Sequence, residues 1–371
     1  LLKAVAERLK ALLDPGITLA RLGGDEFAVL AESCPQLVHA GSLAQRIIDE
    51  LREPLHIEGH RLFVNASIGI SLFPSDALSA EQLLRNADSA LFKAKSAGRD
   101  GYALYTEELT AHAQQRVEIG FELRRALEQQ ELRVYYQPVH DLKSSRLIGV
   151  EALVRWQHPQ RGLVSPAEFI PIAERTGLIA AIDAWVMRQA CEQMCRWQAA
   201  GVGLSFVAVN VSSRLFARRE LYQQVAQVLR ETGLDPAYLE LEVTESAVMD
   251  DPEVALEQMH RLRELGVRLA IDDFGTGYSS LLRLKRLPVQ KLKIDQGFVA
   301  GLPWDEDDAA IVRVIIALAQ SMGMQVHAEG IEQVEQARFL LEQDCTLGQG
   351  YWFGRPVPDQ QLDWAHAPEI R

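Results

Sequence analysis

The chain has 371 residues, of which 24% are charged and 48% hydrophobic, and its formal net charge is -13. This length suits two globular domains that each bury a core, and the composition excludes a disordered chain. The acidic balance argues against a surface for nucleic acid polymers, and no apolar run approaches a membrane span. Four cysteines show no zinc or disulfide framework, which indicates a reducing cytoplasm.

The first hundred residues predict a small α+β module. Two apolar strands are separated by Gly23-Gly24 and by the acids Asp25 and Glu26, a spacing typical of a hairpin with the acids at its tip. The predicted elements are a helix over 1–13, strands over 17–22, 27–30 and 62–72, and a helix over 80–96.

The hairpin motif is RLGGDEFAVL, and SIGISLFP and ADSALFKAKSAGRDGYALY follow it. Over residues 1–105 these motifs resemble the GGDEF family of diguanylate cyclase domains. The family's N-terminal half, with another metal-binding Asp and the guanine-reading residues, does not precede the motif, and Asp14 and Ile17 replace the inhibitory Arg-x-x-Asp pattern. We therefore expect this module alone neither to make cyclic diguanylate nor to bind it at an inhibitory site. The resemblance implies a nucleotide and metal site made of Gly23, Gly24, Asp25, Glu26, Lys95 and Arg99.

Residues 106–130 are polar, lack proline, contain one glycine and repeat apolar residues at helical spacing. We expect a helical connector that acts as a stiff rod between a domain over 1–105 and a domain over 131–371. In the second domain, apolar strands alternate with helical stretches, as in a TIM-type (β/α)8 barrel of the α/β class. The strand candidates are 133–136, 147–154, 204–211, 239–243, 267–271, 291–294, 325–328 and 345–353.

The fifth strand candidate ends on two adjacent carboxylates, Asp272 and Asp273. In isolation this pair would indicate a turn with a helix N-cap, and a kinase interpretation lacks the accompanying catalytic and glycine-rich loops. Two like charges at a buried strand end stay ionised only if a cation or strong donors compensate them. A metal site is therefore the favoured interpretation.

Polar residues also stand in or at the ends of the other strands, where barrel enzymes build their active sites. Oxygen ligands favour Mg²⁺ or Mn²⁺ over zinc, and His327 is expected to be packed or solvated rather than a ligand. The residues expected to converge are Glu151, Asn210, Glu242, Asp272, Asp273, Lys293, Glu329 and Gln349.

These residues lie within the motifs EALVRWQHP, FIPIAERTGLI, VNVS, ELEVTES, DDFGTGYSSL, KLKID, AEGIE and GQGYWFGRP. Over residues 120–358 the motifs resemble the EAL family of cyclic diguanylate phosphodiesterases. The resemblance implies hydrolysis to linear 5'-pGpG with two divalent ions and with Lys293, Glu329, Glu151 and Asp272 as catalytic residues. One ion would be bound by Glu151, Asn210, Glu242 and Asp272, and the other by Asp272, Asp273 and Glu329.

The same resemblance implies that Lys293 holds the attacking water. Substrate contacts are implied for Gln137, Leu153, Arg155 and Gln349, and loop-stabilising roles for Glu245 and Glu332. The segment KID is followed by Gln296-Gly297, which departs from the family pattern outside the metal set.

Three functions remain open at this point. A hydrolase comes first because every metal-set position is filled; the others are a non-catalytic receptor for cyclic di-GMP, and a bifunctional cyclase and phosphodiesterase in the full-length protein. The EAL resemblance implies a homodimer in which the loop at 274–280 links the interface to the metal set, and we expect GTP bound at the GGDEF-like module to regulate the barrel. The chain would be the cytoplasmic part of a bacterial signalling protein, and an upstream sensory or membrane region stays open.

Overall fold

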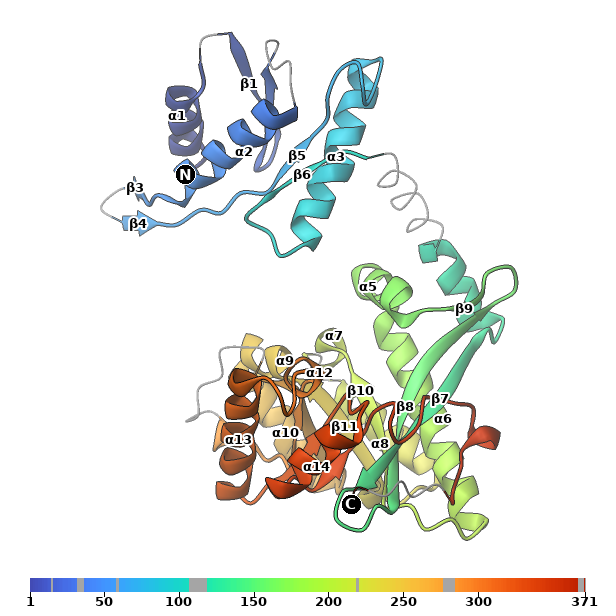
Figure 1. Ribbon diagram of the computed structural model, residues 1–371. Helices are drawn as coiled ribbons and strands as arrows, with labels where there is room; N and C mark the ends of the chain where they lie inside the picture. Colours follow the sequence, from blue (N-terminus) through green and yellow to red (C-terminus); the bar gives the residue numbers. More distant parts are fainter. Residues whose placement is uncertain are drawn as a thin grey trace. The chain divides into compact units, whose positions relative to one another are not determined.

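The computed structural model describes residues 1–14, 16–31, 37–57, 60–106, 119–217, 220–275, 284–365 and 370. They form two compact units, Leu1–Glu118 and Ile119–Arg371, which are coloured blue to teal and green to red in Figure 1. Among the described residues no helix is long and apolar enough to cross a membrane.

The first unit is an α+β module built around a small apolar core of Val5, Leu9, Ile47, Leu51 and Leu55. Strands β1 and β2 form the predicted antiparallel hairpin, with Gly23 paired to Glu26. Strands β3 and β4 pair antiparallel, and β5 and β6 pair parallel. The elements are α1 (Leu2–Leu12), β1 (Ile17–Gly23), β2 (Glu26–Ala31), α2 (Leu37–Arg52), β3 (Leu55–Ile57), β4 (His60–Leu62), β5 (Ile68–Ile70), α3 (Ala80–Ser96) and β6 (Tyr102–Leu104).

One prediction for this unit was wrong, and one helix was missed. The single strand expected over 62–72 is interrupted, because β4 ends at Leu62 and only Ile68–Ile70 is extended further on. Helix α2 was not predicted, although Leu43, Ile47 and Leu51 recur at the spacing of one helix face. The helices expected over 1–13 and 80–96 are confirmed as α1 and α3.

The second unit is the predicted barrel. Strand β8 pairs with both β7 and β10, which closes the sheet into a barrel of eight described strands. The strands are β7 (Leu132–Asp141), β8 (Leu147–His158), β10 (Phe206–Val211), β11 (Leu239–Thr244), β12 (Arg268–Phe274), β13 (Lys291–Ile294), β14 (Gln325–Ala328) and β15 (Leu347–Gly348).

One barrel strand runs against the others. Strand β7 is antiparallel to both β8 and β15, whereas the remaining pairings within the barrel are parallel. A short turn joins β7 to β8, and such a connection allows only an antiparallel pair, because parallel strands need a long crossover. The far end of β8 pairs with β9 (Gly162–Val164), so the β7–β8 ribbon extends beyond the barrel (Figure 1).

Helices connect the later strands (Figure 1). Their apolar side chains are buried in the core of the barrel unit. Helix α10, for example, begins where the Asp251 side chain accepts a hydrogen bond from Val254 N, and ends at Gly266 with φ of 100°. The connections contain α5 (Pro166–Thr176), α6 (Ile179–Ala199), α7 (Ser213–Phe216), α8 (Leu221–Thr232), η1 (Pro236–Tyr238), α9 (Glu245–Asp250), α10 (Pro252–Leu265), α12 (Gln296–Ala300), α13 (Glu306–Ser321) and α14 (Val334–Glu342), and η2 (Asp359–Gln361) follows β15.

The predicted connector lies partly outside the described residues, which omit 107–118. Residues 119–128 are helical, as expected. Their side chains Ile119, Leu123 and Ala126 are buried in the core of the second unit. This part of the connector is therefore packed on the barrel unit along its length.

The barrel interior is closed at one level by an apolar layer of Val139, Phe206, Ala208 and Leu347. Gly149 makes room for this layer, since a Cβ at that position would lie 2.4 Å from the Phe206 ring. Strand alternation places Glu151, two residues further along β8, on the same inner face. The apolar layer thus forms the floor beneath the candidate site.

Candidate active site

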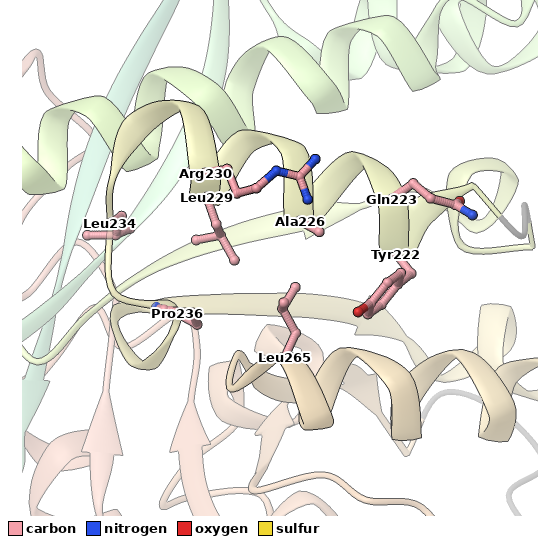
Figure 2. Close-up of a pocket in the computed structure, with 8 residues that line it drawn as sticks. All are labelled: Tyr222, Gln223, Ala226, Leu229, Arg230, Leu234, Pro236 and Leu265. Carbon is pink, nitrogen blue, oxygen red and sulfur yellow. The ribbon is translucent and has the colours of Figure 1, made fainter.

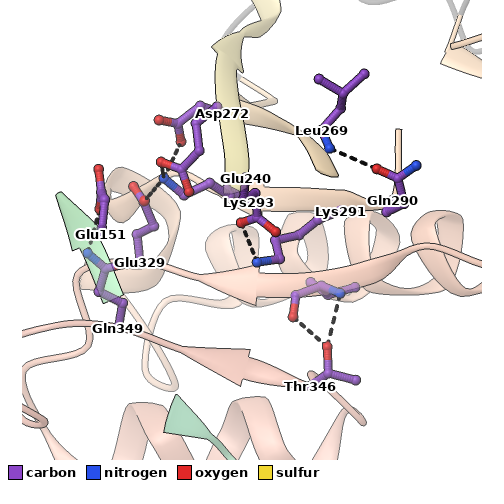
Figure 3. A network of polar contacts seen from close by, with 12 residues as sticks. Glu151, Glu240, Leu269, Asp272, Gln290, Lys291, Lys293, Glu329, Thr346 and Gln349 are labelled. Carbon is purple, nitrogen blue, oxygen red and sulfur yellow. Dashed lines mark hydrogen bonds and ion pairs between the residues drawn. The ribbon is translucent and has the colours of Figure 1, made fainter. Parts of the chain in front are cut away.

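The barrel brings the predicted polar residues to one place. In the parallel register Asn210 pairs with Glu242, so these two side chains lie at a similar height, and Asp272 lies two residues beyond Ala270, the partner of Glu242. Figure 3 shows Glu151, Asp272, Glu329 and Gln349 around Lys293. Glu329 and Gln349 lie one residue beyond the ends of β14 and β15.

Lys293 is the centre of the cluster and is fully buried. Its Nζ lies 2.5 Å from Glu242 Oε2, 2.6 Å from Glu329 Oε1 and 3.2 Å from Asp272 Oδ1. Burial alone would lower the pKa of Lys293, but the surrounding carboxylates, Asp272 foremost, raise it well above its usual value. The lysine is therefore charged, and three carboxylates surround its ammonium group.

The carboxylates outnumber the lysine. Burial raises the pKa of Glu242, with Lys293 opposing the shift. Burial also raises the pKa of Glu329 to about 8, where Lys293 again opposes and Asp272 adds to the rise. The pKa of Asp273 is raised to about 6 by burial and by Asp272. Such a site favours any additional positive charge that can enter it.

The donor set fits a hard divalent cation. Oxygen atoms of Asp272, Asp273 and Glu329 all lie within 4.8 Å of one another. Among the described residues Glu242 Oε1 is buried without a hydrogen-bond partner, which is costly unless something else compensates it. All of these ligand atoms are carboxylate oxygens, which suit Mg²⁺ or Mn²⁺. Metal binding by these residues stays a prediction.

Asp273 reaches the cluster through an irregular backbone. Its φ is 53°, in the left-handed region that non-glycine residues seldom adopt, and the β12–β13 register shifts between Ile271 and Phe274. Without this irregularity, consecutive side chains of a strand would point to opposite faces. The bulge therefore lets Asp272 and Asp273 face the same cluster.

Glu151 is held from both sides by amides. Asn210 Nδ2 donates to Glu151 Oε1 at 2.6 Å, and Gln349 Nε2 donates to Glu151 Oε2 at 2.6 Å. Gln349 Nε2 also donates to Gln137 Oε1 at 3.0 Å, and Gln137 Nε2 donates to the Gly354 carbonyl at 3.2 Å. Two residues predicted to meet substrate thus adjoin the predicted metal ligands directly.

The other predicted substrate residues lie further along β8. Leu153 and Arg155 are half-buried, and the Arg155 guanidinium lies 5.7 Å from the centre of the Tyr135 ring. Burial lowers the pKa of Arg155, and Glu151 opposes that shift. Arg155 is therefore a partly desolvated cation within the field of the acidic cluster.

Glu245 and Glu332 were predicted to stabilise loops. Glu245 is buried at the start of α9, and its Oε2 accepts a hydrogen bond from Gly275 N at 2.9 Å, two residues after Asp273. Glu332 is exposed, and its backbone N–H donates to Gln336 Oε1 at 2.8 Å. The segment 276–283, which includes most of the predicted dimer loop, lies outside the described residues.

The structure adds polar residues that sequence reasoning missed. Lys291 and Glu240 form a second buried ion pair, visible in Figure 3. His327 was expected to be packed or solvated, and it is fully buried. The sequence signal for this second ion pair was the alternation of Glu240 with Glu242 on β11 and of Lys291 with Lys293 on β13, because residues two apart in a strand share a face.

The hairpin tip of the first unit is exposed. Gly23, Gly24, Asp25 and Glu26 are all exposed, and a Cβ added at either glycine would meet nothing within 4 Å. Gly24 has a φ of 48°, and its carbonyl accepts hydrogen bonds from Arg21. The backbone at this tip is therefore open to solvent. The remaining predicted contacts, Lys95 and Arg99, are also exposed.

A hollow of about 440 Å³ lies on the outside of the barrel, away from this cluster. Figure 2 shows it between α8 and α10, with Leu229 and Leu265 facing each other across it. Its lining is mainly apolar, contains no carboxylate and includes none of the predicted site residues. It has no part in the chemistry of the carboxylate cluster.

Comparison with known families matches both units. The model of the EAL domain matches residues 121–356, and the model described as "Diguanylate cyclase, GGDEF domain" matches residues 1–101. The first match spans more than half of the chain and contains every residue of the carboxylate cluster.

Two curated relatives come from Pseudomonas aeruginosa. MucR, named a bifunctional diguanylate cyclase/cyclic di-GMP phosphodiesterase, is 44% identical over 98% of this chain and 53% of its own length. NbdA, named a cyclic di-GMP phosphodiesterase, is 42% identical over 98% of this chain and 46% of its own length. The chain thus spans about half the length of these relatives.

Among solved structures, the PaMucR phosphodiesterase in complex with c-di-GMP is 46% identical. The match covers 66% of this chain and 100% of that chain, with a TM-score of 0.65. The EAL domain of Mycobacterium smegmatis DcpA is 37% identical over 62% of this chain and 95% of that chain, with a TM-score of 0.54.

Proposed function

The chain belongs to the EAL domain family, with a GGDEF-family segment ahead of the barrel, and we propose that the barrel hydrolyses cyclic di-GMP to linear 5'-pGpG. The names of MucR and NbdA support this substrate. The observation that carries the proposal is the carboxylate cluster around Lys293, with a buried Glu242 oxygen that has no hydrogen-bond partner among the described residues.

Two divalent ions, Mg²⁺ or Mn²⁺, would be the cofactors. When bound, they supply Lewis acidity that makes a water nucleophilic at neutral pH and neutralises the non-bridging phosphate oxygens. Asp272 would be shared between the two sites. The ligands would be Glu151, Asn210, Glu242 and Asp272 for one ion, and Asp272, Asp273 and Glu329 for the other.

Lys293 would orient the attacking water. Its ammonium group lies within 3.2 Å of carboxylate oxygens of Glu242, Asp272 and Glu329, and bound cations would compete for those oxygens and leave the ammonium to hold a water. Because Lys293 is fully buried, the donor that it then presents is shielded from bulk water and acts strongly on the nucleophile.

The residues beside the metal set would hold the substrate. Gln349 and Gln137 share a hydrogen bond next to Glu151, and Leu153 and Arg155 follow on the same strand. The half-buried Arg155 guanidinium can donate to a phosphate of the dinucleotide, a charge-assisted bond of the stronger kind. Together these residues would place one phosphodiester of cyclic di-GMP over the acidic cluster.

The decisive experiment incubates the protein with cyclic di-GMP and either Mg²⁺ or Mn²⁺, and separates the products by chromatography. We expect pGpG to accumulate with metal and not with chelator. No turnover with either metal, together with binding of cyclic di-GMP measured by calorimetry, would instead identify a non-catalytic receptor.

We further propose that the barrel forms a two-fold homodimer through the loop at 274–280, as the EAL resemblance implies. The hydrogen bond from Gly275 N to Glu245 Oε2 supports a coupling between the dimer interface and the predicted metal ligands, since it holds the start of this loop two residues after Asp273. Light scattering and turnover measured over the same concentration range test the proposal. A fully active monomer would contradict it.

GTP is the proposed regulator in the full-length protein, which we place in the bacterial cytoplasm. The exposed hairpin tip at Gly23–Glu26 leaves room for a nucleotide. This regulation requires GTP to bind the active arrangement more tightly than the inactive one, typically by about 5- to 150-fold. In the full-length protein, GTP should change the hydrolysis rate, and Glu26→Ala should abolish the response. Tight GTP binding without any change in rate would contradict the regulatory role and leave a module without function in this protein, or a true cyclase, as the alternatives.

A further inference from the structure

The β7–β8 ribbon continues from the candidate site beyond the barrel. In its antiparallel register Gln137 lies opposite Glu151. Two residues away on each strand, Tyr135 lies opposite Leu153, and Arg155 follows on β8 after a further two residues. Directly opposite residues share one face of a strand pair, and so do residues two apart in a strand. Tyr135 therefore stands on the same face as the predicted substrate residues, although no role was predicted for it.

The Arg155 guanidinium lies over the Tyr135 ring. Its central carbon is 5.7 Å from the ring centre, within the distance of about 6 Å at which an aromatic face attracts a cation. The two residues are diagonal neighbours across the strands, a separation that an aromatic ring and a long side chain can bridge. Both side chains are half-buried, so water weakens the attraction less than at an open surface. The ring therefore restricts where the guanidinium can lie.

Arg155 keeps most of its hydrogen-bonding capacity. Its Nη1 donates to the Val154 carbonyl at 2.8 Å, which is its one hydrogen bond to the part of the chain that the structure describes. No described carboxylate forms a direct ion pair with it. An attraction to an aromatic face uses none of the N–H donors of a guanidinium in a hydrogen bond. The remaining donors are therefore available to a ligand.

A second arginine on the ribbon indicates that this ligand is an anion. Arg133 lies directly opposite Arg155, and like charges in that position destabilise a strand pair. Arg133 Nη1 donates to the carbonyls of Gln130 at 2.5 Å and of Leu132 at 2.7 Å, and it has no ion pair with a described carboxylate. A phosphate group beside the ribbon would relieve the repulsion and accept hydrogen bonds from a guanidinium.

We propose that Tyr135 is a positioning residue, whose ring holds the Arg155 guanidinium ready to donate to a phosphate oxygen of the bound dinucleotide. Arg155 stands four residues along β8 from Glu151, roughly 13 Å of strand. It therefore meets a part of the substrate away from the phosphorus at the carboxylate cluster, and it contributes to binding rather than to the chemical step. The inference rests on the proposed function, because it takes cyclic di-GMP as the ligand of the ribbon.

The first test needs neither metal nor substrate. In the full chain with ¹⁵N-labelled arginine, the Nε–H signal of Arg155 is identified by its loss in Arg155→Lys, and its order parameter is measured by NMR relaxation. We expect an ordered guanidinium in the unmodified protein and in Tyr135→Phe, which keeps the ring. Tyr135→Leu keeps apolar bulk without an aromatic face, and the order parameter should fall below about 0.6. A guanidinium that is equally ordered, or equally disordered, in all of these proteins would overturn the inference.

Hydrolysis of cyclic di-GMP at saturating Mg²⁺ or Mn²⁺ provides the second test. Tyr135→Leu should raise KM by about 5-fold, within the range of about 2- to 30-fold expected for one cation–π contact. The value of kcat should change little, since a contact with a remote part of the substrate is made equally in the ground state and in the transition state. Tyr135→Phe should restore most of the affinity, because the ring rather than the hydroxyl makes the contact. A lower kcat with an unchanged KM, or a KM as high in Tyr135→Phe as in Tyr135→Leu, would contradict the proposal.

Two further variants separate this contact from general effects on the barrel. In Tyr135→Leu/Arg155→Gln, KM should equal that of Arg155→Gln alone, because both residues act through one contact. The matched control is Tyr222→Leu, since the Arg261 guanidinium lies 4.5 Å from the Tyr222 ring centre, at the hollow outside the barrel. This control should leave KM normal. Additive increases in the double variant, or an equal increase in Tyr222→Leu, would show that Tyr135 does not act through Arg155.

The two experiments distinguish failure of this inference from failure of the proposed function. An active enzyme with a normal KM in Tyr135→Leu would refute the role of Tyr135 and leave the proposed function intact. If the unmodified protein neither hydrolyses nor binds cyclic di-GMP, the proposed function fails. The order parameter of Arg155 then still decides whether the Tyr135 ring holds the guanidinium.

Discussion

Lys291 Nζ and Glu240 Oε1 lie 2.5 Å apart inside the barrel, two residues before Lys293 and Glu242 on the same two strands. Both side chains are buried, and the Lys291 ammonium lies 3.9 Å from the centre of the Phe206 ring. The barrel therefore contains two stacked lysine–glutamate pairs. The upper pair belongs to the carboxylate cluster, and the lower pair lies beside the apolar floor.

The lower pair gives a prediction about stability. Lys291→Met should lower the free energy of unfolding by about 3 to 5 kcal/mol, because it leaves Glu240 buried without its partner. The double variant Lys291→Met/Glu240→Leu should regain most of this loss, since it also removes the desolvated carboxylate. Urea unfolding at pH 7 measures both. Equal losses in the single and double variants would show that packing, rather than charge, dominates at this position.

The predicted metal ligands give a prediction about turnover. Asp272→Asn and Glu242→Gln keep the shape of the side chain and remove the charge that would hold a cation, so hydrolysis of cyclic di-GMP should fall by orders of magnitude. Lys291→Met/Glu240→Leu is the matched control, because it removes a glutamate from the same strand as Glu242 and should leave turnover nearly normal. Near-normal hydrolysis by Asp272→Asn at low metal concentration would refute the two-metal assignment.

Lys293→Ala should have a different effect from the metal-ligand variants. It should spare metal binding and slow the chemical step, so the maximal rate falls while the affinity for substrate changes little. The variant also leaves Glu242, Asp272 and Glu329 without their shared cation, so the metal-free protein should unfold more easily. Mn²⁺ at about 100 times its dissociation constant should restore about 2.7 kcal/mol. A variant with a normal maximal rate and only weaker substrate binding would contradict the role of Lys293.

Much of the barrel and of its cluster could be predicted from the chain alone. From β10 onward each strand ends close to a polar site residue, and the carboxyl ends of parallel barrel strands must converge, so Asp272 and Lys293 could be placed together without coordinates. The reversed direction of β7 was harder to foresee, because an apolar strand pattern carries no information about its direction. It follows from the short β7–β8 turn.

Contacts that depend on register and side-chain direction were not predictable to the same degree. The ion pair of Lys291 with Glu240 and the amide contacts of Glu151 need the alignment of strands far apart in sequence. Period-2 alternation gives the face of each side chain but not its height relative to the neighbouring strand. The roles of the individual site residues therefore stay predictions, although the structure brings those residues together.

Asp183 and Ser212 form another buried polar contact between residues far apart in the sequence. Asp183 is buried on α6, and its Oδ2 accepts hydrogen bonds from Ser212 N at 3.0 Å and from Ser212 Oγ at 2.5 Å. Ser212 follows β10 directly and begins α7. Burial raises the pKa of Asp183 to about 6, and the two hydrogen bonds from Ser212 oppose the shift.

This shift gives a prediction about pH. The pKa of Asp183 is about 6 in the folded protein and about 3.9 in the unfolded chain. The folded state therefore binds this proton more tightly than the unfolded state does. The stability that the protonated group contributes is complete below about pH 4 and is lost as the pH rises through 6. The loss amounts to about 3 kcal/mol. Asp183→Asn keeps an oxygen acceptor for Ser212 without a titrating proton, so its stability relative to the unmodified protein should increase from pH 4.5 to pH 7.5. Urea midpoints of both proteins across this range test it, and parallel curves would mean that the Ser212 hydrogen bonds fully compensate the burial of the charge.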